Sequence, residues 1–331
     1  MVAPRMRAPD VPRSSATFGN ARKPSQTLGS LRERSAKVGS ARLRSGTFGE
    51  FPRVASAGSG HSRNSSPTAV DCVQAGGVVM DRWRGKVAVV TGASAGIGAA
   101  VAQALVRHGL KVVGLARSLD KMQAYAEELK GAPGEFHPLK VDMTKEADIL
   151  AAFQWIKKHL GVVHVLVNNA GVVYEARLLD GPTEQWRAIV ETNILGYNIC
   201  TREAYQIMKE KGVDDGHIIN MNSVCGHGMP HNYPFVVYLA SKHAITALTD
   251  GLRRELTDAG SRIKVTSLSP GTVKTDIMYR NNTTSVDPGK VYSKHPYLTS
   301  EDIADSLVYV LSTPPNVQIS ELTIAPVGEK W

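Results

Sequence analysis

The stretch KVAVVTGASAGIG, residues 86–98, decides the fold of this chain, because a strand pattern passes directly into a glycine-rich turn there. Residues 86–91 form a short run rich in valine, as expected for a parallel strand that is buried on both faces. From residue 97 apolar residues recur at helical spacing, and the turn before this helix contains Gly92, Gly96 and Gly98. Glycine permits positive φ and close approach of a ligand, and a helix N-terminus attracts anions. The stretch therefore predicts a turn that binds the pyrophosphate of a dinucleotide, the alternative being a tight turn without a ligand.

The remainder of the chain alternates strand and helix patterns. We expect strands at 86–91, 111–116, 136–141, 163–168, 217–222, 263–268 and 319–325. Helices are expected at 97–109, 119–130, 146–159, 183–211, 238–258 and 301–311. Strict alternation is typical of an α/β protein with helices on both faces of a parallel sheet. The pattern predicts a doubly wound Rossmann fold with a seven-stranded parallel sheet, formed by one domain at 80–331.

Residues 1–79 have a different composition. They are rich in Arg, Ser and Gly, repeat every ten residues from Ala16 to Ala55, and carry a net charge of +8 out of +9 for the whole chain. Too few apolar side chains are present to offset the entropy of ordering, so we expect a disordered extension. It could be a targeting segment, a weak binder of nucleic acid or anionic membrane, or a dispensable extension ahead of a domain that begins at Met80. The nearly neutral remainder predicts no nucleic-acid surface.

The overall composition suits a globular protein, with 42% hydrophobic and 21% charged residues. Cys72, Cys200 and Cys225 have no metal-type spacing and make no even disulfide set, so we expect a reducing compartment, a cytoplasmic location and no bound metal. A transit function of 1–79 would change that location. No run of about 18 apolar residues occurs, so no membrane span is expected.

The end of the second strand predicts the type of dinucleotide. An acidic residue about 20 positions after the glycines would bind the free ribose hydroxyl of NAD, whereas an arginine would accept the extra phosphate of NADP. Arg117 occupies this place, followed by Ser118 as the expected helix cap. Asp120 falls in the first helical turn, where acidic residues are common. We therefore expect NADP, although Arg117 could also be an ordinary surface arginine.

Two stretches place a tyrosine four residues before a lysine: YQIMK at 205–209 and YLASK at 238–242. Tyr205 lies midway along a predicted helix, far in sequence from any strand end, so we interpret this pair as packing or surface residues. Tyr238 begins a helix after a strand whose carboxyl end delivers Ser223, and ligands of open α/β sheets bind at such ends. Tyr238 and Lys242 share one helix face.

Ser223, Tyr238 and Lys242 together suit hydride transfer. A ketone that accepts hydride needs a proton at oxygen, which a tyrosine can donate. We expect a nearby ammonium and a positively charged nicotinamide ring to lower the pKa of Tyr238 from its usual value. The Ser223 hydroxyl can donate a hydrogen bond to the same substrate oxygen.

The sequence resembles the short-chain dehydrogenase/reductase family over about residues 85–327. The resemblance rests on TGASAGIG at 91–98, NNAG at 168–171, Asn193 in ETNILG, Ser223, YLASK and the dipeptide PG at 270–271. It implies that Tyr238 is the acid–base residue, that Ser223 binds the substrate oxygen, that Lys242 holds the nicotinamide ribose, and that Asn193 supports a water-linked proton relay. Fifteen positions separate Ser223 from Tyr238, two more than is usual in the family, which implies an altered loop wall of the substrate pocket.

The same resemblance completes the expected cofactor site. Asp142 would contact adenine, unless it merely caps the next helix, and Thr275 would contact the carboxamide. The expected cofactor-binding residues are Gly92, Ser94, Gly96, Ile97, Gly98, Arg117, Ser118, Asp142, Asn169, Ala170, Gly171, Tyr238, Lys242, Pro270, Gly271, Val273 and Thr275.

Three longer stretches are similar to one group of that family. They begin at Met80, at Ile199 and at Val308, and they resemble the animal farnesol dehydrogenase and dehydrogenase/reductase member 11 group. The resemblance implies NADP-dependent interconversion of isoprenoid alcohols or of hydroxy- and ketosteroids. It also implies a homodimer or homotetramer formed through helices 183–211 and 238–258.

The loop after Ser223 predicts an apolar substrate. No Arg or Lys occurs in 224–237, which makes a carboxylate or phosphate substrate less fitting than a hydrophobic alcohol or carbonyl compound. The candidate lining residues are Met229, Pro230, Tyr233, Phe235, Val236, Met278 and Tyr279, although several could simply pack the loop. Cys225 is interpreted as a small buried residue rather than a nucleophile.

Two further hypotheses remain at this point. The chain could be an NADP-binding sensor or scaffold with little turnover, which loss of Ser223, Tyr238 or Lys242 would have favoured, but all three are present. The arginine-rich extension could also make it a nucleic-acid-associated protein.

Overall fold

A computed structural model describes residues 80–229, 234–279 and 287–330. The disorder expected for 1–79 falls outside these residues, as do the pocket candidates Pro230 and Tyr233. Among the helices of the described part, none is long and apolar enough to cross a membrane.

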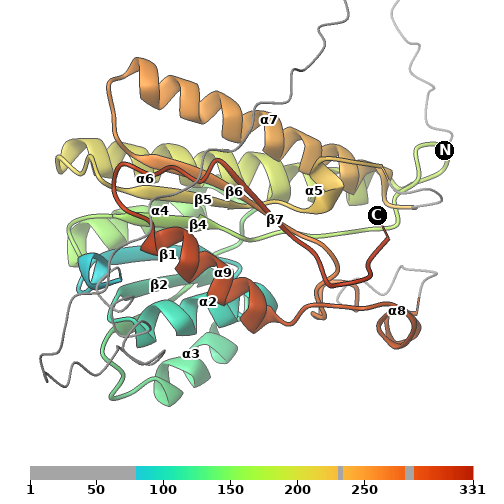
Figure 1. Ribbon diagram of the computed structural model, residues 1–331, viewed down its shortest axis with the longest axis horizontal. Coiled ribbons are helices and arrows are strands. Elements are labelled where there is room, and N and C mark those ends of the chain that lie inside the picture. The colour runs from blue at the N-terminus through green and yellow to red at the C-terminus, as the bar shows by residue number, and fades with distance from the viewer. Residues whose placement is uncertain (1–79, 230–233, 280–286, 331) are drawn as a thin grey trace, which may run out of the picture. The chain divides into compact units, whose positions relative to one another are not determined.

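Seven strands form one parallel sheet, as the alternating pattern predicts (Figure 1). The strand order is β3-β2-β1-β4-β5-β6-β7, so the direction of winding reverses between β1 and β4. The strands are β1 (Val87–Thr91), β2 (Lys111–Ala116), β3 (Glu135–Lys140), β4 (Val165–Asn168), β5 (His217–Met221), β6 (Lys264–Pro270) and β7 (Glu321–Ile324). This arrangement confirms the predicted Rossmann fold.

Helices cover both faces of the sheet (Figure 1). Side chains of α2 (Gly96–Arg107), α3 (Leu119–Glu128) and α9 (Ser300–Ser312) share one buried cluster with the sheet. On the opposite face, α4 (Glu146–His159), α6 (Tyr197–Glu210) and α7 (Val236–Asp258) build the second cluster. Within the described residues, the other α-helices are α5 (Thr183–Val190) and α8 (Pro288–Lys294).

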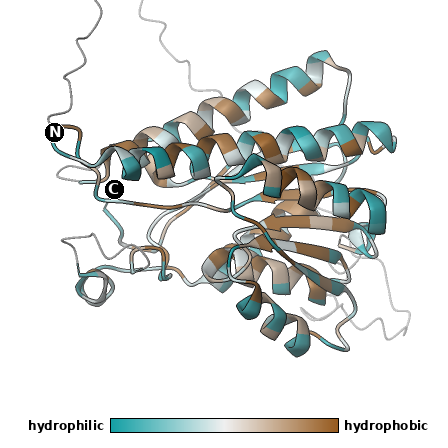
Figure 2. Cartoon of the chain, turned by 180° about the vertical axis from the view of Figure 1, so that it is seen from behind, coloured by the Kyte–Doolittle hydropathy of each residue, from teal (hydrophilic) through white to brown (hydrophobic). Residues whose placement is uncertain are grey.

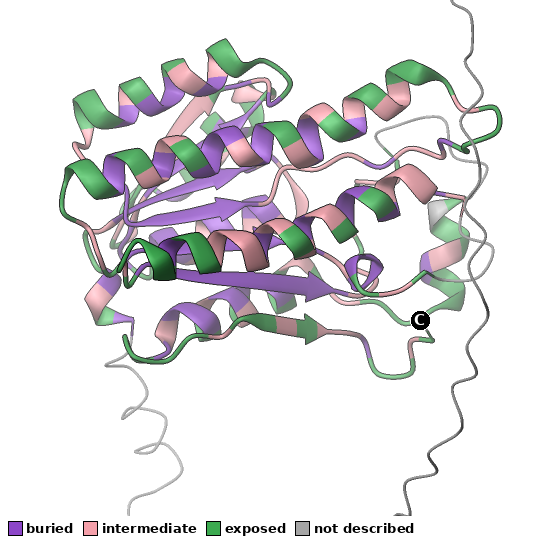
Figure 3. Cartoon of the chain, turned by 90° about the horizontal axis from the view of Figure 1, so that it is seen from above, coloured by how far each residue is buried: buried purple, intermediate pink, exposed green. Residues whose placement is uncertain are grey.

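The valine-rich composition of the first strand follows from this two-sided burial. Ala88 and Val90 point into the cluster of α2 and α9, whereas Val87 and Val89 point into the cluster of α4 and α6. Successive side chains of a strand face opposite ways, so a strand covered on both faces must be apolar throughout. Figure 2 shows the central strands as hydrophobic and Figure 3 shows them as buried.

The helix predicted at 183–211 is present but is not a uniform α-helix. A π-helical segment, Glu191–Gly196, separates α5 from α6 and contains Asn193. The apolar periodicity continues through this region, so sequence spacing could not reveal the wider turn. The short helix α8 was not predicted, although Asp287 as N-cap and Pro288 at the first helical position are sequence signals for its start.

Two histidines are buried near the amino ends of the strands. The Nδ1 atom of His164 accepts a hydrogen bond of 3.1 Å from the backbone N–H of Val87, so this ring is neutral. His217 Nε2 lies 2.8 Å from Thr266 Oγ1, whose own hydroxyl donates to the Ile319 carbonyl. Thr266 Oγ1 therefore accepts from His217, which places the proton on Nε2. Burial and the charge of Lys86 lower the pKa of His164 to about 4, and burial with Lys264 and Arg82 lowers the pKa of His217 well below its usual value.

Because both histidines are buried and neutral, we expect the free energy of unfolding to decrease at acidic pH. In the unfolded chain each takes up a proton near its ordinary pKa, whereas in the folded chain it does not. The free energy of unfolding should thus fall as the pH drops from about 7.5 to 5.5, with a slope approaching about 1.4 kcal/mol per pH unit for each histidine below its unfolded pKa. Urea unfolding of the whole chain at several pH values measures this slope.

The matched variants are His217→Gln, which keeps a donor toward Thr266, and His108→Gln at an exposed position. We expect the first to flatten the pH dependence by about half and the second to leave it unchanged. Parallel pH curves for wild type and His217→Gln would contradict the assignment.

Candidate active site

The site lies where the winding of the sheet reverses, at the carboxyl ends of β1 and β4. Thr91, the last residue of β1, accepts hydrogen bonds at Oγ1 from the backbone N–H groups of Asn169 and Ala170, both at 2.9 Å. The NNAG segment after β4 is thereby fixed to the turn after β1. Ligands of open α/β sheets bind at such a reversal.

The glycine-rich turn fits a phosphate cradle. Gly92 and Gly96 have φ of 71° and 55°, values that favour glycine. A Cβ on Gly98 would overlap both the Gly92 carbonyl oxygen and Asn169 Nδ2. The same Asn169 Nδ2 donates 2.8 Å to the carbonyl of Thr91. Each glycine is thus needed for backbone conformation or close packing. Gly96, Ile97 and Gly98 at the start of α2 line the cleft, and a helix N-terminus can bind an anion there.

One cleft brings together most of the predicted cofactor residues. Those that line it are Gly92, Ser94, Gly96, Ile97, Gly98, Arg117, Ser118, Asp142, Asn169, Ala170, Gly171, Tyr238, Lys242 and Thr275. Pro270, Gly271, Val273, Asn193 and Ser223 do not belong to its lining. Lining residues outside the predicted cofactor set include Ala95 and Thr192, which lie within the TGASAGIG and ETNILG motifs, and Met221, Asn222, Asp276 and Ile277. Met221 ends β5 and Asn222 directly follows it, so a wider search at strand ends would have found these two.

The adenosine end of the cleft is formed after β2 and β3. Ser118 occupies the cap position of α3, as predicted, but its side chain makes no capping hydrogen bond, and Arg117 beside it is exposed. Asp142 Oδ1 accepts hydrogen bonds from the N–H and hydroxyl of Thr144 at 3.1 and 2.8 Å. Burial acts to raise the pKa of Asp142, but these bonds and the charge of Arg117 outweigh it and lower the pKa. Asp142 is therefore an ionised turn residue that also lines the cleft, and not the cap of α4, which is Lys145.

Tyr238 and Lys242 lie one turn apart at the start of α7 and both line the cleft. Lys242 Nζ is 5.7 Å from the centroid of the Tyr238 ring and donates a hydrogen bond of 2.8 Å to the carbonyl of Met221, the last residue of β5. Burial lowers the pKa of Lys242 to about 8, with Cys225 acting in the opposite direction.

The lowered pKa expected for Tyr238 refers to the complex with the nicotinamide, and in the chain alone the pKa shifts in the opposite direction. Burial raises the pKa of Tyr238 above its ordinary value, Cys225 adds to this rise, and a hydrogen bond with Ser223 only partly opposes it. Desolvation disfavours the phenolate more than the neighbouring groups stabilise it. The phenol is consequently protonated near neutral pH and can act as an acid.

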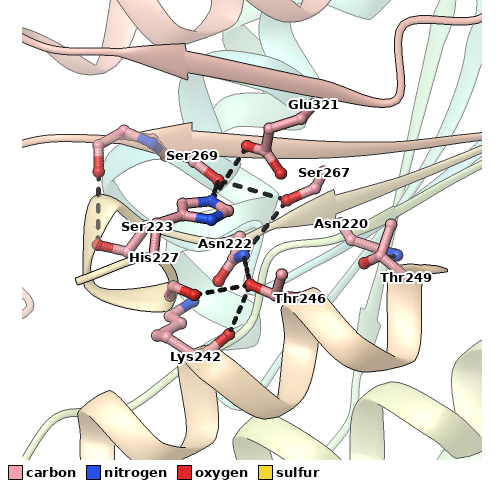
Figure 4. Close-up of polar contacts among 12 residues, drawn as sticks. Asn220, Asn222, Ser223, His227, Lys242, Thr246, Thr249, Ser267, Ser269 and Glu321 are labelled. Atoms are coloured by element: carbon pink, nitrogen blue, oxygen red, sulfur yellow. Dashed lines mark hydrogen bonds and ion pairs between the residues drawn. The ribbon is translucent and has the colours of Figure 1, made fainter. Parts of the chain in front are cut away.

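Ser223 is held by hydrogen bonds at the turn that follows β5. Its Oγ accepts a hydrogen bond of 3.1 Å from Cys225 N–H and lies 3.4 Å from the carbonyl oxygen of Pro270. The turn Val224–Gly226 packs closely against Asn222, because a Cβ on Gly226 would overlap the Asn222 side-chain amide. Thr246 Oγ1 donates to the carbonyls of Gly226 and Lys242 at 3.0 and 3.3 Å. Figure 4 shows Thr246 beside Lys242 and Asn222.

The same turn is tied to the neighbouring strands. His227, just after the turn, places Nε2 3.0 Å from Ser269 Oγ and 3.4 Å from Glu321 Oε1 (Figure 4). Ser269 belongs to β6 and Glu321 to β7. The loop that carries Ser223 is therefore anchored on three strands.

Asn193 lies beside this site rather than in the cleft wall. Its Nδ2 donates to the carbonyl of Val172 and to Ser241 Oγ at 3.0 and 3.1 Å, and its Oδ1 accepts from Val172 N–H at 2.9 Å. Ser241 in turn donates 2.7 Å to the carbonyl of Tyr238. The side chain of Asn193 thus positions the start of α7 and the segment after NNAG.

Tyr205 and Lys209 lie elsewhere. Tyr205 lines a hollow between α6 and α7 and packs against the core cluster of α4 and α6, while Lys209 is exposed. Neither lines the cleft, which agrees with the interpretation of YQIMK as packing and surface residues.

An apolar cluster adjoins Tyr238. Val173, Cys225, Phe235 and Leu239 are buried together, and Tyr238, Ile277 and Met278 pack against them. Of the predicted pocket residues, Phe235 and Met278 belong to this cluster, whereas Met229 and Tyr279 are largely exposed.

Comparisons with known proteins agree with this geometry. The chain is 49% identical over 254 residues to farnesol dehydrogenase of Aedes aegypti, covering 76% of this chain and 100% of that protein. It is 46% identical over 255 residues to dehydrogenase/reductase SDR family member 11 of Mus musculus, covering 76% and 97%. Its fold is similar to an alcohol dehydrogenase from the archaeon Thermococcus sibiricus complexed with 5-hydroxy-NADP, with a TM-score of 0.65, 28% identity, and coverage of 74% and 98%.

The family model for short chain dehydrogenases matches residues 86–285, which include the glycine-rich turn, the NNAG segment, Ser223 and the Tyr238–Lys242 pair. The chain therefore belongs to the short-chain dehydrogenase family.

Proposed function

We propose that this chain is an NADP-dependent oxidoreductase that interconverts a hydrophobic alcohol and its carbonyl compound. The observation that carries the proposal is that Tyr238 and Lys242 line the same cleft as the glycine-rich turn. A proton donor and a dinucleotide cradle in one cleft are the two parts that carbonyl reduction needs.

The choice of NADP is supported at the end of β2. Arg117 and Ser118 both line the cleft, and no acidic side chain ends this strand. A guanidinium suits the extra phosphate of NADP, since it can donate several charge-assisted hydrogen bonds. The archaeal alcohol dehydrogenase with a similar fold was solved with 5-hydroxy-NADP, which supports the same choice.

Each residue of the site has a defined task in this proposal. The nicotinamide, when bound, supplies or accepts the hydride. The Tyr238 hydroxyl donates a proton to the carbonyl oxygen during reduction and takes it back during oxidation, and Ser223 donates a hydrogen bond to that oxygen. Lys242, held by the Met221 carbonyl, keeps a positive charge next to Tyr238 and binds the nicotinamide ribose. Asn193 holds the start of α7 through Ser241.

The substrate class rests on the apolar cluster beside Tyr238 and on the relatives. Val173, Phe235 and Met278 offer no charge to a substrate, so an isoprenoid alcohol such as farnesol or a hydroxy- or ketosteroid fits. The similarity to the Aedes aegypti farnesol dehydrogenase favours the isoprenoid. The alternative is an NADP-binding sensor or scaffold with little turnover.

Assembly and location are part of the proposal. The outer faces of α6 and α7 form a hollow with Tyr205, Leu248 and Leu252 on its walls, which supports a homodimer or homotetramer through these helices. Cys200 and Cys225 are both buried, which suits a reducing, cytoplasmic setting, unless residues 1–79 direct the protein elsewhere.

Replacing Tyr238 tests the catalytic assignment. We expect Tyr238→Phe to lower kcat by about 10²- to 10⁴-fold, the usual contribution of a positioned acid–base group, with NADPH binding retained. Tyr205→Phe is the matched control and should keep kcat within about twofold, since its hydroxyl is remote from the cleft. Comparable losses in both variants would refute the assignment.

Replacing Arg117 tests the cofactor assignment. We expect Arg117→Asp to change the ratio of kcat/KM for NADPH over NADH by about 10- to 100-fold toward NADH, because a charge-assisted contact is lost and a repulsive charge is added. Lys121→Asp makes the same charge change at an exposed position of α3 and should leave the ratio unchanged. A preference unaltered by Arg117→Asp would exclude Arg117 as the recognising residue.

Turnover of defined substrates tests the activity itself. The purified chain should oxidise NADPH in the presence of farnesal or a ketosteroid, and should do so faster than with a charged keto acid, because the cluster beside Tyr238 is apolar. Tight NADPH binding without turnover of any acceptor would favour the sensor alternative.

A further inference from the structure

The segment that follows β7 folds back onto the loop that follows β6. The backbone N–H of Gly271 donates a hydrogen bond of 2.7 Å to the carbonyl of Ile324, the last residue of β7. A turn then closes with a bond of 3.1 Å from Glu329 N–H to the carbonyl of Pro326. This turn brings the Glu329 side chain back against the PG dipeptide at 270–271.

The Glu329 carboxylate binds the first residue after this dipeptide through two hydrogen bonds. Its Oε1 accepts from the backbone N–H of Thr272 at 2.9 Å and from the Thr272 hydroxyl at 2.5 Å. The second oxygen, Oε2, is buried and has no hydrogen-bond partner among the described residues. A carboxylate in such a place is held by its contact with Thr272 alone, and hydrogen bonds to charged groups are among the stronger ones.

Gly271 leaves the room that this contact requires. A Cβ at this position would overlap Glu329 Oε2 and lie 3.2 Å from Pro326 Cδ. Gly271 does not have positive φ, so glycine is not required here for the backbone conformation. It is required because a side chain would occupy the place of the Glu329 carboxylate. The glycine of the PG dipeptide is thus explained by the returning carboxylate.

Thr272 begins the loop that forms one wall of the cleft. Its carbonyl accepts 2.9 Å from Leu298 N–H, and Lys274 N–H donates 2.8 Å to the carbonyl of Leu298. Thr275, Asp276 and Ile277, further along this loop, line the cleft. The Thr275 methyl carbon lies 3.3 Å from the place of a Cβ on Gly96, so the loop packs against the glycine-rich turn.

We propose that Glu329 is a positioning residue for the dinucleotide, because it fixes the wall formed by residues 272–277 from outside the cleft. The proposal rests on the NADP binding proposed above. It assigns Glu329 no contact with the cofactor and no part in the chemistry. Without the carboxylate, Thr272 loses two hydrogen bonds at the point where the loop leaves β6. Cofactor binding must then order residues 272–277, and the free energy of this ordering weakens the observed affinity.

The geometry of the sheet separates this effect from that of Arg117. Residues 272–277 follow β6, whereas Arg117 follows β2, and three strands, β1, β4 and β5, lie between them. Neighbouring strands are about 4.8 Å apart, so the end of β6, where Glu329 holds Thr272, is roughly 19 Å from the end of β2. Glu329 should therefore influence NADPH and NADH equally, unlike Arg117.

The experiment is a fluorescence titration of the whole chain with NADPH and with NADH, together with KM for the carbonyl substrate and urea unfolding. We expect Glu329→Ala to raise Kd for both cofactors by about 5- to 30-fold, the effect of losing one or two hydrogen bonds to a charged group. Glu329→Gln keeps an acceptor for Thr272 and removes a poorly solvated charge, so its Kd should stay within about twofold. Glu301→Ala, at an exposed carboxylate of α9, should leave Kd unchanged.

A double-mutant cycle identifies the contact. Thr272→Val removes the hydroxyl bond and should raise Kd by about two- to fivefold, and combining it with Glu329→Ala should add nothing to the single Glu329→Ala effect. If Glu329→Ala proves too unstable to purify, Thr272→Val decides the matter by itself, since an unchanged Kd there would overturn the proposal.

The outcomes separate the two proposals. Equal Kd values for wild type and Glu329→Ala, with lower stability of the variant, would reduce Glu329 to a structural role and leave the proposed function intact. A rise in Kd for NADPH but not for NADH would also contradict the inference. Failure of the unmodified chain to bind either cofactor would overturn both proposals together.

Discussion

One hydroxyl group, Oγ1 of Thr91, connects the two halves of the sheet at the point where the site is built. It accepts two backbone N–H bonds from the segment after β4 and lies 3.4 Å from the carbonyl oxygen of Val167 within β4. Because Thr91 is also the residue before Gly92, the start of the glycine-rich turn and the NNAG segment are joined by these contacts. The parallel register of β1 with β4 places these groups opposite each other.

The other parts of the site are attached around this junction, strand by strand across the sheet. The Asn169 side chain donates to the Thr91 carbonyl and packs against Gly98. Lys242 Nζ donates to the carbonyl of Met221, the last residue of β5. The loop after β6 packs against Gly96. Each wall of the cleft is therefore anchored to the carboxyl end of a different strand, and the buried histidines lie near the opposite ends of the strands. Because helices cover both faces of the sheet, the polar site lies at the carboxyl ends of the strands, and the histidines near the amino ends are buried and neutral.

Residues with strong local signals could be predicted from the sequence. The valine run of β1, the glycines after it and the pairing of Tyr238 with Lys242 follow from periodicity and spacing, and the structure agrees on fold and cleft. What the sequence could not reveal depends on partners distant along the chain. The amide of Asn193 is engaged by Val172 and Ser241, and the raised pKa of Tyr238 follows from burial that no local pattern encodes. Glu329, which reaches Thr272 through the turn after β7, carries no motif at all.

The π-helical segment around Asn193 has a consequence for how this region can change. A π turn includes one more residue than an α turn while completing about the same rotation, so the helix after it starts with an offset of one residue, or about 100°. For that reason, the residues that α5 and α6 turn toward the protein core need not follow one common helical periodicity. Removal of a single residue between Glu191 and Gly196 would merge them into one α-helix, and either Asn193 would turn away from Val172 or α6 would turn its apolar face away from the sheet.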